Sequence, residues 1–146
     1  MNRSLFTSKT DNWATPSAFF AELDREFGFT LDPCCVPETA LCPKFYTPEE
    51  DGLAQTWRGE RVFMNPPYGR DIGQWIAKAY LEAQKGALVV ALVPARTDTA
   101  WWQNYVIGKA SICYLSGRLK FGNSKQSAPF PSAILVYWGG DTKGKF

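Results

Sequence analysis

The sequence predicts an α/β fold with a mostly parallel sheet and helices on both faces. Short apolar runs alternate with amphipathic helical patterns, which is the order of strand and helix in such folds. One run, residues 87–94, is apolar throughout, which is typical of a strand covered on both sides. The length of 146 residues fits a single domain.

The chain is expected to open with a loose polar arm over residues 1–12, followed by one domain over residues 13–146. A first helix should begin at Thr15 and Pro16, with Thr15 as its cap and Pro16 at its first position, and end at Gly28. Its apolar stripe consists of Phe19, Phe20, Leu23 and Phe27. Residues 29–32 then form a short strand.

The later elements continue the alternation. An irregular stretch rich in proline and cysteine extends to about residue 59 and contains a short strand at 44–47. A strand at 62–65 precedes a helix at 71–85, whose apolar face carries Ile72, Trp75, Ile76, Ala79, Tyr80 and Ala83. After the strand at 87–94 we expect a helix at 98–107 and strands at 111–116 and 133–138, joined by a polar loop.

Composition limits the chemistry. The chain has no histidine, which excludes Ser-His-Asp and Cys-His catalysis and zinc sites that need imidazole. Four cysteines, without zinc-knuckle spacing, predict reduced thiols and no metal site: Cys34, Cys35, Cys42 and Cys113. The absence of a long apolar run or a secretory signal predicts a cytoplasmic protein with no membrane partner. The net charge of +2 is weak evidence for a nucleic-acid partner.

The most informative motif is the turn Asn65-Pro66-Pro67-Tyr68, which directly follows the apolar run 61–64. The lone pair of an aromatic amine is delocalised into its ring, so the nitrogen attacks a methyl donor only if it is driven towards tetrahedral geometry. Two acceptors aimed at its two hydrogens do this: the side-chain oxygen of Asn65 and the backbone carbonyl of Pro66. The turn therefore predicts methyl transfer to an amino group, most simply that of adenine.

The rest of the turn suits the same task. Pro66 and Pro67 fix φ near −65° and hold the two acceptors in place before the substrate arrives. Tyr68 offers a flat face for stacking of a purine. The alternative is a turn of ordinary turn-forming residues that carries a surface tyrosine.

Five motifs occur in a characteristic order: Trp13-Ala14-Thr15-Pro16, Leu31-Asp32-Pro33-Cys34, Asp51-Gly52-Leu53 with Trp57, Asn65-Pro66-Pro67-Tyr68-Gly69, and Gly117-Arg118-Leu119-Lys120-Phe121. This order resembles the phage-type DNA N-6-adenine methyltransferases, over residues 13–138. The resemblance implies a single Rossmann-like class I methyltransferase domain that uses S-adenosylmethionine as cofactor. It also implies that the Asn-Pro-Pro-Tyr turn is catalytic.

By the same resemblance, Thr15 and Pro16 would touch the methionine end of the cofactor. Asp32, Pro33 and Cys34 would lie beneath it, and Asp51 would approach its adenine moiety. Asp32 and Asp51 also suit plain turns, before Pro33 and Gly52 respectively. The loop after Asp32 lacks the glycines common in related enzymes, so its approach to a ligand is expected to be less close.

DNA is the expected partner, with the target adenine flipped out of the duplex. The expected contact surface is the loop 117–132, together with Arg70 and Arg96. Its phosphate-binding candidates are Arg118, Lys120 and Lys125, with Asn123, Gln126, Phe121 and Phe130 nearby. The chain has no length for a separate recognition domain, which predicts relaxed or short-site specificity, or recognition shared with a second subunit in a homo-oligomer.

Two other functions remain open from the sequence. The same turn would serve an amino-methyltransferase acting on RNA or on a protein glutamine. A non-catalytic nucleic-acid-binding module on a decayed methyltransferase fold is the alternative from a different class, because the loop after Asp32 has no glycine.

Overall fold

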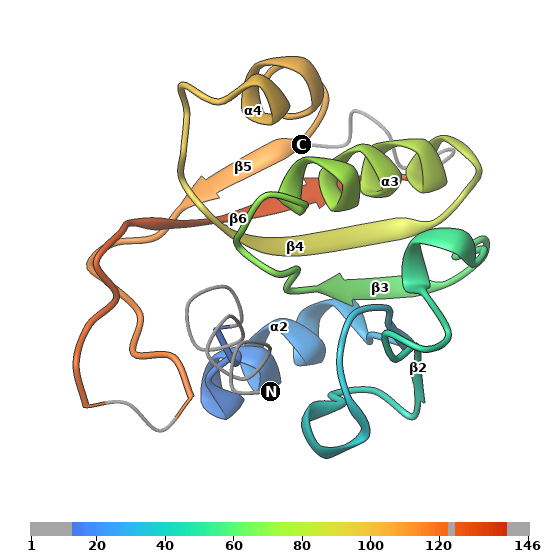
Figure 1. The fold of residues 1–146 in the computed structure, drawn as a ribbon, viewed down its shortest axis with the longest axis horizontal. Helices are drawn as coiled ribbons and strands as arrows, with labels where there is room; N and C mark the ends of the chain where they lie inside the picture. The colour runs from blue at the N-terminus through green and yellow to red at the C-terminus, as the bar shows by residue number, and fades with distance from the viewer. Residues whose placement is uncertain (1–12, 123–124, 140–146) are drawn as a thin grey trace.

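A computed structural model describes residues 13–122 and 125–139 and contains one mixed sheet (Figure 1). Its six strands lie in the order β2-β1-β3-β4-β6-β5. They are β1 (Leu31–Asp32), β2 (Lys44–Phe45), β3 (Arg61–Met64), β4 (Leu88–Pro94), β5 (Ser111–Tyr114) and β6 (Ser132–Tyr137). The α/β class and the predicted strands are confirmed, with ends that differ by a few residues.

Five of the six described strands run in the same direction, as expected for a mostly parallel sheet, whereas β6 runs against them. The pairings from β2 through β1 and β3 to β4 are parallel, whereas β4–β6 and β5–β6 are antiparallel. The physical reason is the connection between β5 and β6. It carries no helix among its described residues and returns directly beside β5, which places the two strands antiparallel.

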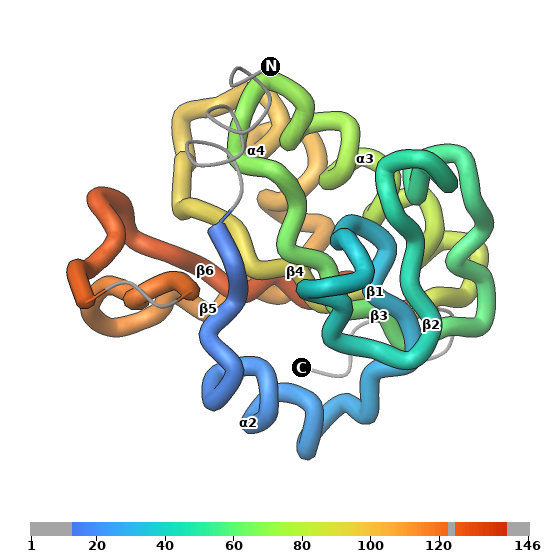
Figure 2. The backbone as a smooth tube through the Cα atoms, turned by 60° about the horizontal axis from the view of Figure 1, so that its bottom comes forward, coloured from blue at the N-terminus to red at the C-terminus, as the bar shows by residue number. Residues whose placement is uncertain are grey.

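Helices cover both faces of the sheet, as predicted. Figure 2 shows α2 (Ser17–Phe27) on one side and both α3 (Ile72–Gln84) and α4 (Ala100–Tyr105) on the other. Two short 3-10 helices, η1 (Pro37–Thr39) and η2 (Gly52–Ala54), lie in the irregular stretch before β3. None of the helices in the described part of the chain is long and apolar enough to cross a membrane.

The start of α2 differs from the prediction. The cap position is Pro16, no side chain caps the helix, and the first helical residue is Ser17. The hydroxyl of Thr15 instead accepts a hydrogen bond from the side chain of Asn65. The end of α2 is as predicted: Gly28 adopts φ +65 and its N–H bonds to the carbonyl of Asp24.

The core lies between the sheet and the helices. Every residue of β4 is buried, in agreement with the apolar run that predicted this strand. Under α2, the ring of Phe63 lies 5.2 Å from that of Phe20 and 5.3 Å from that of Phe29. Burial of these aromatic rings fixes α2 against β3.

Strand order places a crevice between β1 and β3. These neighbours are parallel, with Leu31 opposite Val62, and the chain leaves β1 towards β2 and β3 towards β4, on opposite sides. Ligands in open α/β sheets bind outside the carboxyl ends of strands at such a point. Asp32 ends β1 and Asn65 follows β3, so both residues lie at this edge of the sheet.

Candidate active site

A cavity of about 670 Å³ opens at the carboxyl ends of β1 and β3. Small-molecule sites range from roughly 300 to 1,000 Å³, so its size suits a cofactor with part of a substrate. Most of the predicted catalytic and cofactor residues line it: Thr15, Asp32, Pro33, Cys34, Asp51, Asn65 and Pro67. The fold therefore brings residues from distant motifs to one cavity. Trp13 and Asn65, for example, are 52 positions apart in the sequence and are joined by a hydrogen bond.

Asn65 is held by its amide nitrogen. Its Nδ2 donates to the carbonyl oxygen of Trp13 and, over 2.9 Å, to Oγ1 of Thr15. Its Oδ1 is buried and has no hydrogen-bond partner among the described residues. A buried acceptor without a donor is costly and is commonly explained by a ligand. Asn65 thus presents an unused acceptor at the cavity wall.

Tyr68 lies deeper than predicted. Its side chain is 3% exposed, and its hydroxyl donates to the carbonyl of Leu92 over 3.0 Å. Phe121 and Phe130 meet its ring edge-on, with centroids 6.1 and 5.7 Å away. Burial raises the pKa of the phenol well above its usual range, so it stays a neutral donor. The alternative of a surface tyrosine is wrong, and stacking on this ring requires Phe121 or Phe130 to move.

Asp32 shapes the cavity wall. Its buried carboxylate accepts from the N–H of Leu41 over 3.1 Å and from that of Cys34 over 3.4 Å. Burial raises the pKa of Asp32, while these two backbone N–H groups act in the opposite direction. The carboxylate therefore ties the irregular segment after β1 to the strand end.

Three of the cysteines surround this carboxylate. Burial, with the charge of Asp32 adding to it, raises the pKa of Cys34 well above its usual range and that of Cys35 and Cys42 to about 12. The thiols are therefore protonated at neutral pH. The backbone N–H of Asn65 faces the sulfur of Cys34, which joins the ends of β1 and β3. All four cysteines of the chain lie in the described residues and are unpaired.

The loop after β1 is approached closely by Gly52, a glycine on another loop. A Cβ at Gly52 would lie 2.0 Å from the carbonyl oxygen of Pro33, so no other residue fits without displacement. Asp51 beside it adopts the left-handed conformation at φ 57, which is costly outside glycine, and its carboxylate accepts from the N–H of Leu53. The Asp51–Gly52 turn therefore packs closely against the glycine-free loop that follows β1.

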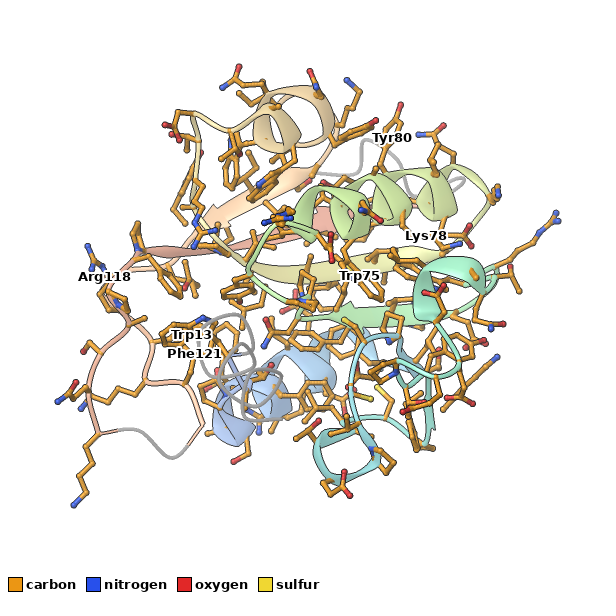
Figure 3. The ribbon with its side chains drawn as sticks, viewed as in Figure 1. Trp13, Trp75, Lys78, Tyr80, Arg118 and Phe121 are labelled. Carbon is orange, nitrogen blue, oxygen red and sulfur yellow. The ribbon has the colours of Figure 1, made fainter. Side chains whose placement is uncertain are left out.

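A buried carboxylate that the sequence analysis missed anchors that turn. The indole N–H of Trp57 donates to the carbonyl of Gly52 over 3.0 Å, and its backbone N–H donates to Glu82 over 2.7 Å. Lys78 pairs with Glu82 over 3.3 Å and lies over the ring of Trp57; Figure 3 shows Lys78 beside Trp75. Positions 75, 79 and 82 share one helix face. In the sequence, this role was indicated by Glu82 itself, an acidic residue on the apolar face of the helix.

The whole chain can now be compared with known proteins. A sequence model of the DNA N-6-adenine-methyltransferase (Dam) family matches residues 3–138. The chain belongs to this family. The resemblance inferred from the five motifs is therefore confirmed.

Two proteins from Escherichia coli and one of its phages are similar to this chain in sequence. The DNA N-6-adenine-methyltransferase of Escherichia phage T1 is 32% identical over 112 residues, which cover 75% of this chain and 46% of the phage protein. YfdM of Escherichia coli (strain K12) is 38% identical over 66 residues, which cover 40% of this chain and 71% of that protein. The chain thus spans less than half of the phage relative.

The basic residues predicted to contact DNA differ in position and in solvent exposure. Arg118, Lys120 and Lys125 are exposed on the connection between β5 and β6, which projects from the sheet (Figures 1 and 3). Arg70 is exposed two residues after Tyr68. Arg96 is half-buried, with its guanidinium 6.0 Å from the ring centre of Phe130. Asn123 lies outside the described residues.

Phe121 and Phe130 face inward from the same connection. Trp13 meets both rings edge-on, with centroids 5.6 and 5.2 Å away, and the two phenylalanine rings lie 5.9 Å apart in a tilted arrangement. Figure 3 shows Trp13 and Phe121 side by side. The described part of this connection therefore has a polar outer side and an aromatic inner side that packs on Tyr68 of the Asn-Pro-Pro-Tyr turn.

Proposed function

We propose that this chain transfers a methyl group from S-adenosylmethionine to the exocyclic N6 amine of adenine in DNA. The observation that carries the proposal is the buried Oδ1 of Asn65, an acceptor without a donor at the wall of the cavity. An amine hydrogen is the complementary group. Membership of the Dam family, whose name states this reaction, gives independent support.

In the proposed reaction, the oxygen of Asn65 and the backbone carbonyl of Pro66 accept the two amine hydrogens. This draws the nitrogen lone pair out of the ring and directs it at the methyl group. The new N–C bond would form as the sulfur–methyl bond of the donor breaks, with the neutral thioether as leaving group. One amine proton would then leave to water, so the absence of histidine from the chain is no obstacle. Pro66 is buried and Pro67 half-buried, which keeps both acceptors in place.

The cavity suits the cofactor. S-adenosylmethionine would supply an electrophilic methyl group there. The volume and mixed lining of the cavity support binding by Asp32, Pro33, Cys34 and Asp51. We extend this proposal to Pro16 and to the atoms of Thr15 other than its hydroxyl, which accepts from Asn65. The left-handed Asp51 supports a role for this turn, because strained backbone concentrates at functional sites.

The DNA is proposed to contact the exposed cations Arg118, Lys120 and Lys125, with Arg70 and Arg96 nearer the catalytic turn. The adenine would be flipped out of the duplex, and Phe121 and Phe130 would separate from Tyr68 to admit it. We propose a single Rossmann-like domain over residues 13–146 that works in the cytoplasm. Its specificity is proposed to be relaxed or limited to a short site, unless another copy of the chain in a homo-oligomer shares recognition.

The test is transfer of labelled methyl from S-adenosylmethionine to unmethylated DNA, followed by mass analysis of the nucleosides. The expected product is N6-methyladenine. Asn65→Ala should lose at least about a hundredfold in kcat, as for removal of one oxyanion donor, while cofactor affinity measured by calorimetry stays unchanged. Ser17→Ala, at an exposed neighbouring position, is the control and should retain full activity.

Other results would assign a different function to the chain. Cofactor binding without a DNA product, but with methylated RNA or methylated protein glutamine, would assign a different substrate. No cofactor binding and no product would indicate a non-catalytic module. Full activity of Asn65→Ala would refute the mechanism itself.

A further inference from the structure

We infer that Thr15 is a positioning residue whose hydroxyl holds the Asn65 amide in the orientation that the carbonyl of Trp13 selects. The inference rests on the proposed function, because it concerns how Asn65 presents its oxygen to an amine. It assigns to the Thr15 hydroxyl a task other than contact with the cofactor.

The amide of asparagine has two similar sides with opposite chemistry. Turned one way, Asn65 offers an oxygen that accepts an amine hydrogen; turned by half a rotation, it offers an NH₂ group that opposes the amine. Only the first orientation supports methyl transfer. The turn backbone does not choose between them, because the rotation occurs about the side-chain bond.

The carbonyl of Trp13 selects between them, because it can only accept and therefore requires the nitrogen of Asn65 on its side. Oγ1 of Thr15 accepts the second hydrogen over 2.9 Å and holds the amide in this orientation. Rotation of the amide would place Oδ1 against the Trp13 carbonyl and lose that bond, although the Thr15 hydroxyl could still donate to Oδ1. The NH₂ group would then take the place of the unused acceptor.

The Thr15 hydroxyl is available for this because it does not cap the helix. A threonine directly before Pro16 is placed to cap α2, yet no side chain makes a cap hydrogen bond there. The hydroxyl points instead to a residue 50 positions later in the chain. Thr15, which the sequence placed as a helix cap, therefore contacts the Asn-Pro-Pro-Tyr turn instead.

The segment that carries Thr15 is itself anchored. The N–H of Gly122 donates to the carbonyl of Ala14 over 2.8 Å, and the ring of Trp13 packs edge-on against Phe121 and Phe130. These contacts fix the backbone on which the Trp13 carbonyl and the Thr15 hydroxyl are mounted. They also connect the orientation of Asn65 to the β5–β6 connection.

The test compares Thr15→Val with Thr15→Ser. Valine keeps the shape and removes the hydroxyl, whereas serine keeps the hydroxyl. Thr15→Val should lower kcat for DNA adenine methylation by about tenfold or more, as expected for loss of one hydrogen bond in the core of a site. The Kd for S-adenosylmethionine should change less than twofold, and Thr15→Ser should restore kcat.

A readout without turnover uses the side-chain NH₂ signals of Asn65 in ¹⁵N spectra, identified by their loss in Asn65→Asp. In the wild type and Thr15→Ser they should be protected from exchange with water. In Thr15→Val one of the two hydrogens should exchange faster. Ser17→Ala controls for changes at the start of α2 and should leave these signals unchanged.

Each outcome decides the inference. Unchanged kcat and unchanged NH₂ signals in Thr15→Val would overturn it, as would a weaker cofactor affinity with normal kcat, which would assign the hydroxyl to the cofactor. If Thr15→Val does not fold, Thr15→Ala takes its place and must show the same loss. A wild type that makes no N6-methyladenine refutes the proposed function, whereas the NH₂ signals then still report whether Thr15 holds the amide.

Discussion

Replacing Gly52 with alanine tests whether the Asp51–Gly52 turn fixes the shape of the cavity that is proposed to bind the cofactor. The added Cβ would lie 2.0 Å from the carbonyl oxygen and 3.1 Å from the carbonyl carbon of Pro33, and 3.2 Å from the ring of Trp75. Ordinary contacts between carbon and oxygen begin near about 3.3 Å, so the two loops must separate by roughly 1.3 Å. Both loops line the cavity.

The size of the effect follows from this geometry. Overpacking costs about 1–3 kcal/mol, and the upper end applies here because the clash is with backbone, which cannot rotate away. We expect a loss of about 3 kcal/mol in the free energy of unfolding, which lowers Tm by about 6–12 °C for a chain of this length. Movement of the cavity wall by about 1 Å should also weaken S-adenosylmethionine binding by tenfold or more.

Thermal denaturation and calorimetric titration with S-adenosylmethionine measure both effects. Gly73→Ala is the matched control. Its Cβ would meet Trp101 at 3.4 Å, an ordinary contact, and alanine favours the helix by up to about 1 kcal/mol. It should melt at the same temperature as the wild type or higher, with unchanged affinity. If Gly52→Ala melts and binds cofactor like the wild type, the packing argument is refuted.

Two further predictions concern charge. Burial would raise the pKa of Glu82, but the N–H of Trp57 and the charge of Lys78 outweigh it and lower the pKa below its usual range. Its stabilising contribution is therefore present above the unfolded-state pKa and lost as pH falls. Glu82→Gln should lower the free energy of unfolding by about 1–3 kcal/mol at pH 7 and by less near pH 4 in urea titrations; equal losses would exclude the ionic role. Lys120→Ala with Lys125→Ala should weaken DNA binding most at low salt and reduce the slope of log K against log salt by about 1–2. Lys109→Ala, next to Tyr80, should leave that slope unchanged, and an unchanged slope in the double variant would remove these lysines from the DNA surface.

The sequence predicted the elements well because their signals are local. The apolar run at 87–94 and the face formed by Trp75 and Ala79 carry the periodicity of a buried strand and an amphipathic helix. Asp32 and Asn65 lie at the same edge of the sheet, because parallel neighbouring strands end there. The Asn-Pro-Pro-Tyr turn and the family were recognisable for a related reason: consecutive residues carry the motif.

The direction of β6 and the burial of Tyr68 were decided only by the tertiary structure. A strand pattern has the same period in both directions, so the antiparallel pairing of β6 depended on how the connection from β5 returns. The sequence predicted an accessible Tyr68, either as a stacking face for a purine or as a surface side chain. The carbonyl of Leu92 and the ring of Phe130, both distant in sequence, bury it.

By itself, the sequence determined the α/β class, the helices and strands, and the family with its Asn-Pro-Pro-Tyr turn, because these depend on neighbours along the chain. Only the tertiary structure decided that the Thr15 hydroxyl bonds to Asn65 instead of capping α2, and that Glu82 bonds to Trp57 and so supports the Asp51–Gly52 turn. Which partner a polar group takes is settled by the packing that removes water from it.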